Sequence, residues 1–181
     1  MNVGSETALV CSLAFPRKFM QAEDTLGHKA FSKSTALEAL GFLAPLLVDP
    51  VRYLGKKVVV VTDNAAAVLT LKRGYSKNDE WATTLCRAAR VVAAGLCCSL
   101  EARWEPRRSS RQTRISDNLT HNLLEELDDA EVEAYLEKAC VAFPRPILAW
   151  MGAPGVNPSL GFECLQWIKE IFPELKSVMN Q

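Results

Sequence analysis

Three acidic residues of this chain stand at points where the sequence predicts that a secondary-structure element begins or ends. Asp63 follows the apolar run 58–62, Glu38 lies one turn into a leucine-rich helix, and Asp117 opens a helix after a basic loop. Carboxylate oxygens, together with substrate phosphates, are ligands that Mg²⁺ prefers. Two such ions about 4 Å apart can activate water and stabilise the leaving oxygen of a phosphodiester. Taken together, the three carboxylates indicate a metal-binding cluster.

Each of these carboxylates also has a simpler interpretation. Asp63 is suited to capping the helix that follows it, and Asp117, beside Ser116, is suited to the same role or to a helix first turn. Glu38 is suited to a first turn as well, where the helix dipole favours a negative charge. No one of the three residues therefore indicates a metal site by itself, and the cluster depends on folding to bring them together.

Basic residues form two groups beside the acidic ones. The first lies near Asp63 and the second lies beside Asp117: Lys72, Arg73 and Lys77, then Arg107, Arg108, Arg111 and Arg114. Contacts from Lys and Arg to phosphate are the main source of nucleic-acid affinity. The alternative interpretation is an ordinary charged helix end and a solvated loop. We favour nucleic-acid binding, because phosphodiester hydrolysis at an acidic site needs an electropositive approach.

The elements that must position these side chains alternate between strands and helices. Strands are predicted at 8–15, 58–62 and 98–104, with another candidate at 26–31. Helices are predicted from a Ser34 cap to a kink or end at Pro45, from Asn64 to Gly74, over 79–96 and from about 116. This order predicts a mixed α/β sheet with helices on its faces. In the tail, two further helical stretches are predicted, separated by the Pro/Gly-rich break "FPRPILAWMGAPGVNP".

Hydrophobic patterning within the strands predicts which residues are buried. The run 58–62 is apolar without alternation, which is typical of a strand buried on both faces. In 98–104 the apolar residues alternate with polar ones, and Trp104 falls on the apolar side. We therefore interpret Trp104 as core packing and not as a platform for stacking bases.

Length and composition limit the class of protein. The 181 residues suit one domain with an appendage, and we divide them into 1–127 and a helical extension, 128–181. The formal net charge is zero, so a nucleic acid would have to bind to a local patch of basic residues. The six cysteines form no C-x-x-C pair, which favours reduced thiols in an intracellular protein, cytoplasmic or nuclear. Two histidines make a zinc site improbable. No signal peptide or membrane span is predicted.

Three sequence blocks resemble the ribonuclease H domain of retroelement reverse transcriptases, in particular the DIRS-like elements that carry a tyrosine recombinase. "STALEALGFL" resembles the helix with the family's catalytic glutamate, matched by Glu38. "VVVVTDNAAAVLTLKRGYSKN" resembles the strand that ends on a metal-binding aspartate, matched by Asp63. "LEARWEPRRSSRQTRISDNLTH" resembles the W-x-P-R strand and the next helix start, where Asp117 matches the last metal-binding aspartate. The resemblance covers roughly residues 8–121. Ser116 and Thr120 stand where alanine and serine are usual.

The resemblance implies a ribonuclease H-like fold with a C-terminal helical extension. It implies hydrolysis of the RNA strand of an RNA:DNA hybrid with two Mg²⁺ or Mn²⁺ ions, held by Glu38, Asp63 and Asp117. His121, one turn after Asp117, would carry protons or assist product release, unless it is an ordinary surface histidine. The partners implied are the hybrid, which proteins read mainly through shape and 2′-hydroxyls, and a polymerase portion of the same polyprotein. The C-terminal helices would cover one face of the sheet or contact another protein. No membrane is implied.

The chain departs from the family at its start. Family members begin with a strand that carries the first catalytic aspartate, whereas this chain begins "MNVGSETALV". Asn2 is the nearest position, and the nearby acids Glu6, Glu23 and Asp24 fit no motif. We therefore expect either a piece of a longer polyprotein or a catalytically degenerate module that binds protein or nucleic acid. A third interpretation, another nuclease or integrase of the same superfold, is disfavoured by the W-x-P-R block.

Overall fold

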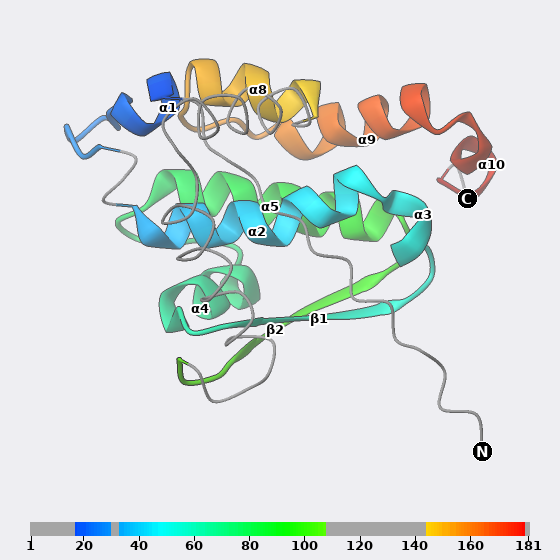
Figure 1. Ribbon diagram of the computed structural model, residues 1–181, viewed down its shortest axis with the longest axis horizontal. Coiled ribbons are helices and arrows are strands. Elements are labelled where there is room, and N and C mark those ends of the chain that lie inside the picture. The colour runs from blue at the N-terminus through cyan, green and yellow to red at the C-terminus, as the bar shows by residue number, and fades with distance from the viewer. Residues whose placement is uncertain (1–16, 30–32, 108–143, 180–181) are drawn as a thin grey trace, which may run out of the picture.

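Helices α2 (Ser34–Val48) and α5 (Glu80–Gly95) form the middle of three layers in the computed structural model, which describes residues 17–29, 33–107 and 144–179. On one side lie strands β1 (Lys57–Thr62) and β2 (Ser99–Trp104) with helix α4 (Ala65–Arg73). On the other side lie α1 (Arg17–Gln21), α8 (Arg145–Gly152) and α9 (Leu160–Ile171) (Figure 1). The shorter elements are α3 (Pro50–Tyr53), a 3₁₀ turn at Pro173–Leu175 and α10 (Lys176–Met179).

Strands β1 and β2 pair in parallel, with α4 and α5 as the connection between them. The register sets Lys57 against Ser99 at one end and Thr62 against Trp104 at the other. Parallel strands need such a helical crossover, so the described residues confirm the predicted α/β class, with a sheet of two parallel strands. The expectation that 58–62 is buried on both faces is wrong. Val58 and Val60 pack against the core, but Val59 is 37% exposed, because α2 and α5 cover the other face of the sheet.

Side-chain caps define the two helices that connect the strands. The Asn64 side chain accepts a hydrogen bond from the Ala67 N–H (3.0 Å), and α4 ends at Gly74 in the left-handed conformation, with φ of 78°. The Asp79 side chain accepts from the Ala82 N–H (3.0 Å) and caps α5. The predicted limits of these helices are confirmed, since caps of this kind satisfy the first free N–H groups.

Helix α2 departs from its prediction at its start, and of the two alternatives for Pro45 it excludes an end there. Its N-cap is Lys33 and not Ser34, which is the first helical residue and makes no capping hydrogen bond. Pro45 does not end the helix, which continues to Val48 and buries Leu46 and Leu47. The hydrophobic contacts of that last turn outweigh the single backbone hydrogen bond that a proline removes.

The C-terminal helices pack on the middle layer and not on the sheet. Ile147 and Trp150 of α8, with Cys164 and Ile168 of α9, are buried in the same hydrophobic core as α2 and α5. Gly161 lets α9 approach α5 closely, because a Cβ atom there would lie 2.7 Å from Val91 Cβ. The expectation that the tail covers a face of the sheet is therefore wrong for α8 and α9.

Two segments have local structures that the sequence did not predict. Helix α8 occupies the stretch read as a Pro/Gly-rich break, with Pro146 in its first turn, where a missing N–H leaves no helical bond unmade. The candidate strand 26–31 starts in a turn instead, because the Asp24 carboxylate accepts hydrogen bonds from the N–H groups of Leu26 and His28 (both 2.8 Å). Lys29, after this turn, forms an isolated antiparallel β-bridge with Glu23. The predicted strand 8–15 and the predicted helices near 116 and 128 lie outside the described residues.

A buried lysine joins this turn to the start of α5. The side chain of Lys33 is 5% exposed, forms an ion pair with Asp24 and lies 3.8 Å from Asp79 Oδ1. Its ammonium also lies 5.3 Å from the centre of the Trp81 ring. Trp81 in turn contacts the rings of Phe19 and Trp150. We call Lys33, Asp24 and Asp79 the Lys33 ion cluster.

The described cysteines are free thiols, as the sequence predicts. Cys86, Cys98 and Cys164 are buried, and Cys97 is exposed. Burial raises the pKa of the Cys86 and Cys164 thiols to about 12. Among the described helices, none combines the length and the apolar character that crossing a bilayer requires.

Candidate functional site

Glu38 of α2 is held at the carboxyl end of β1. The Thr62 hydroxyl donates a hydrogen bond of 2.8 Å to Glu38 Oε2, and the same hydroxyl oxygen accepts from the Asn64 N–H at 3.1 Å. Thr62 is buried and Glu38 is half-buried. One threonine thus connects the middle of a core helix to the point where the strand ends.

A second carboxylate lies near Glu38, because Asp63 directly follows the threonine that binds it. Burial raises the pKa of the Glu38 carboxyl above its ordinary value, and the negative charge of Asp63 raises it further, while the Thr62 hydrogen bond acts in the opposite direction. Two carboxylates that share a partly desolvated site favour protonation of one of them or the binding of a cation. The fold therefore brings together two of the three acidic residues predicted to form the cluster.

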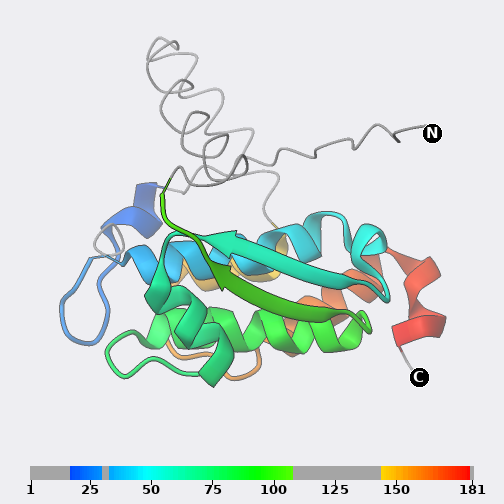
Figure 2. The same cartoon turned by 90° about the horizontal axis from the view of Figure 1, so that it is seen from below.

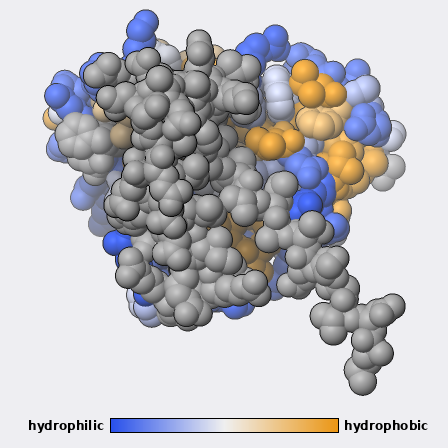
Figure 3. All heavy atoms as spheres, viewed as in Figure 1, coloured by the Kyte–Doolittle hydropathy of each residue, from blue (hydrophilic) through white to orange (hydrophobic). Residues whose placement is uncertain are grey.

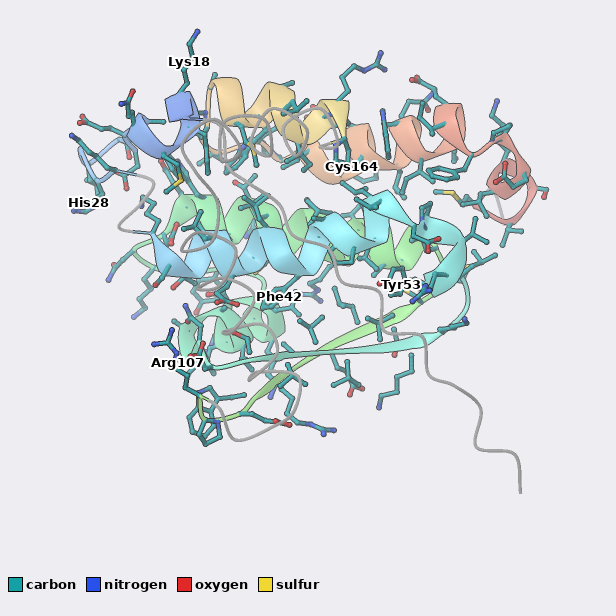
Figure 4. The ribbon with its side chains drawn as sticks, viewed as in Figure 1. Lys18, His28, Phe42, Tyr53, Arg107 and Cys164 are labelled. Carbon is teal, nitrogen blue, oxygen red and sulfur yellow. The ribbon has the colours of Figure 1, made fainter. Side chains whose placement is uncertain are left out.

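Asp63 follows β1 directly, and its backbone is fixed by the neighbouring strand. The indole N–H of Trp104 donates a hydrogen bond to the Asp63 carbonyl (3.0 Å). The Asp63 side chain is exposed and lies 3.7 Å from the Arg107 guanidinium (Asp63 Oδ2 to Arg107 Nε). Figure 4 shows Arg107 beyond the sheet, at the end nearest α4.

The simpler interpretations of these two acids are wrong. Asn64, one residue later, caps α4, so Asp63 is free of that role. Glu38 lies beyond the first turn of α2, which holds no acidic residue. Neither carboxylate is explained by helix formation.

Trp104 corrects another expectation, because it is not core packing. Its side chain is 50% exposed, although Leu100 and Ala102 on the same strand are more buried. Strand alternation gives the side of the sheet correctly but does not say how far the covering helices extend. Trp104 lies at the last position of β2, where that cover ends.

The predicted basic residues are distributed between two places. Arg107 is beside Asp63, whereas Lys72 and Arg73 are exposed in the last turn of α4. A helix of nine residues is about 14 Å long, so these two lie well away from Asp63. Lys77 is exposed in the loop before α5. Asp117, His121, Arg108, Arg111 and Arg114 lie outside the described residues.

The described residues supply two of the three carboxylates predicted to bind magnesium. Glu38 and Asp63 offer carboxylate oxygens, the kind of ligand that Mg²⁺ takes, but the described residues contain no group of three or more acidic, histidine or cysteine side chains able to hold a metal. Asp24 does not complete the set, since its carboxylate is engaged by Lys33. Asp117, the third carboxylate predicted for the cluster, lies outside the described residues.

Several residues that shape this site were not predicted from the sequence. Thr62 orients Glu38, Trp104 holds the Asp63 backbone, and Arg90 and Arg103 line a groove next to Trp104. For Arg103 the signal was present, because strand alternation places it on the polar side. For Arg90 the signal was a charge that interrupts an otherwise apolar helix.

Comparison of the chain with protein-family models, curated proteins and solved structures finds no match.

Proposed function

We propose that this chain is a ribonuclease H domain of a retroelement reverse transcriptase, of the ribonuclease H-like fold. It would hydrolyse the RNA strand of an RNA:DNA hybrid. The observation that carries the proposal is the pairing of Glu38 and Asp63 at the carboxyl end of β1. Functional groups gather at that edge of parallel α/β sheets. These two residues are also the ones that the sequence resemblance assigns to the catalytic helix and strand.

Glu38, Asp63 and Asp117 would hold Mg²⁺ or Mn²⁺, which when bound supplies water activation and charge stabilisation. The residues around them have separate tasks. Thr62 fixes the direction of the Glu38 carboxylate, and the Trp104 indole fixes the backbone of Asp63. Arg107 is largely exposed, and its guanidinium would exchange Asp63 for a substrate phosphate.

The test is cleavage of a labelled RNA:DNA hybrid with Mg²⁺ or Mn²⁺. We expect wild-type cleavage and its loss in Asp63→Asn and Glu38→Gln, because each substitution removes an anionic ligand. Asn64→Ala is the matched control. It lies beside Asp63 and loses only the α4 cap, at about 1 kcal/mol of stability, so it should still cleave well below its melting temperature. Cleavage that survives Asp63→Asn would show that the assigned roles are wrong.

The alternative is a catalytically degenerate module that binds nucleic acid or protein. It is favoured by the Arg107 side chain beside Asp63, which already compensates the carboxylate charge. Thermal unfolding in a Mg²⁺ series distinguishes the two. A binding site would stabilise the fold by about 2.7 kcal/mol at a concentration 100 times Kd, and Asp63→Asn would not respond. Hybrid binding without Mg²⁺-dependent stabilisation or cleavage would support the degenerate module.

A polymerase portion of the same polyprotein is the protein partner that we propose for the C-terminal side. Figure 3 shows hydrophobic atoms gathered over α3 and the end of α9. Val51 of α3 is 48% exposed and Ile171 of α9 is 55% exposed. Substituting both with serine should weaken that association and leave hybrid cleavage unchanged.

A further inference from the structure

A groove runs between α4 and β2, and Val59 of β1 also lines it. Its volume is about 460 Å³, and α4 lies beside β2 with α5 behind them (Figure 2). Leu71, Leu100 and Ala102 contribute apolar lining. The rim carries Lys72 from α4, Arg90 from α5 and Arg103 from β2, and Trp104 also lines it. We call this the α4–β2 groove.

The three cations of the α4–β2 groove are not used by the fold. Lys72, Arg90 and Arg103 are exposed, and none makes an ion pair or side-chain hydrogen bond within the part of the chain that is described. The acidic lining residue, Glu101, is paired instead with Lys57 at 2.9 Å, which reduces its negative field. The groove thus presents three uncompensated positive charges, an arrangement that attracts an anion with spaced charges.

Trp104 gives the groove a second recognition element. Half of its side-chain surface is exposed, while its N–H is held by the Asp63 carbonyl. The ring is therefore held in place with an open apolar surface. Aromatic rings of this kind stack on unpaired bases, whose faces are free, and duplex bases are already stacked on their neighbours. The same hydrogen bond sets Trp104 next to the Glu38–Asp63 pair.

We propose that the α4–β2 groove binds a single-stranded segment of nucleic acid that continues from the Glu38–Asp63 site. Its phosphates contact Lys72, Arg90 and Arg103, and one base stacks on Trp104. That this segment continues from a bound hybrid rests on the proposed function. The groove itself would act as a binding site whether or not the chain cleaves. With this groove occupied, the proposed substrate is a hybrid that carries a single-stranded overhang.

The experiment measures binding of a fluorescent single-stranded RNA 12-mer by anisotropy, in EDTA and over a range of salt. EDTA removes cleavage, so the result does not depend on the nuclease proposal. We expect Lys72→Gln, Arg90→Gln and Arg103→Gln each to weaken binding and to lower the salt slope by about 0.7. Trp104→Ala should weaken binding about tenfold, and Trp104→Phe should retain most of it. Lys176→Gln, on exposed α10 at the other end of the molecule, is the matched control and should bind like the wild type.

Two competition arms decide what the groove recognises. We expect a single-stranded competitor to displace the probe better than a blunt duplex, and an oligoglutamate of equal charge to displace it weakly. Equal displacement by duplex or by oligoglutamate would overturn the proposal, as would charge variants that keep the wild-type salt slope while melting like the wild type. A protein that binds as expected but never cleaves would lose the nuclease proposal and keep this one.

Discussion

At the scale of single residues, the site depends on one hydroxyl and one negative charge. Thr62 anchors Glu38 by a 2.8 Å hydrogen bond, and Asp63 opposes the ionisation of Glu38. A half-buried carboxylate with a raised pKa is unfavourable for stability at neutral pH. Carboxylates of this kind collect at active sites, which agrees with the metal-binding role proposed for Glu38.

The raised pKa of Glu38 predicts a particular pH dependence. Because the folded state holds this proton more tightly than the unfolded state, its contribution to stability is present below the ordinary pKa of 4.5 and is lost as pH rises through the folded pKa. Glu38→Gln keeps an acceptor for Thr62 and removes the charge. We expect this variant to be more stable than the wild type at pH 7 without metal. Urea unfolding from pH 4 to pH 8 measures the difference, which should shrink towards pH 4.

A difference between Glu38→Gln and wild type that stays constant across this pH range would contradict the assignment. Thr62→Val is the matched control for the hydrogen bond. It should lower stability at every pH, by about 1 kcal/mol, because it removes the donor and leaves the charge of Glu38 in place.

The acidic residues of the candidate site could be selected from the sequence. The residues that orient them could not. A carboxylate at the end of an apolar run is visible in the sequence, and so is a glutamate among leucines. That Thr62 bonds Glu38 depends on how α2 crosses the strand, 24 residues away in the chain. The exposure of Trp104 depends on where the covering helices stop. Neither is a local property, so patterning alone misses both.

At the scale of elements, local chemistry predicted some boundaries and tertiary packing set others. Asn64, Gly74 and Asp79 are capping residues whose effect stays within one turn, and their predictions are confirmed. Helix α8 was missed because a proline in a first turn does not break a helix. Helix α2 passes Pro45 because Leu46 and Leu47 are buried beyond it.

Two glycines test how closely the layers approach. Gly161 of α9 faces α5, where an added Cβ would lie 2.7 Å from Val91 Cβ and 3.1 Å from the Ala88 backbone. Gly161→Ala should lower the free energy of unfolding by about 1–3 kcal/mol through overpacking. Gly41 of α2 is exposed, with nothing within 4 Å of its Cβ position. Gly41→Ala should raise stability by about 0.5–1 kcal/mol. Chemical denaturation measures both, and equal effects would show that α9 does not approach α5 in this way.

At the scale of the whole molecule, the Lys33 ion cluster joins the outer layer to the middle one. Asp24 belongs to the turn after α1, Lys33 directly precedes α2 and Asp79 caps α5. A buried lysine is tolerated only with such partners, since removing one leaves an uncompensated charge. The aromatic contacts of Trp81 with Phe19 and Trp150 lie beside the cluster and connect the same layers.

The Lys33 ion cluster predicts sensitivity to acid. The hydrogen bond from Lys33 holds the pKa of the Asp24 carboxyl well below its ordinary value of 3.8, assisted by the N–H groups of His28 and Leu26. The stability that Asp24 contributes is therefore present above pH 3.8 and is lost as pH falls below it. Asp24→Asn should be less stable than the wild type at pH 7 and should converge with it in acid. Parallel urea titrations of the two proteins check this, and parallel curves at all pH values would contradict it.

The burial of Lys33 also has a consequence for chemical labelling. An acylating reagent needs an accessible, unprotonated amine, and this one is 5% exposed and paired with a carboxylate, whereas Lys18 and Lys56 are exposed. In a timed reaction read by mass spectrometry, Lys33 should be modified far more slowly than those two. Its modification would then report that the turn has detached from α5, an opening that the rest of the core need not share.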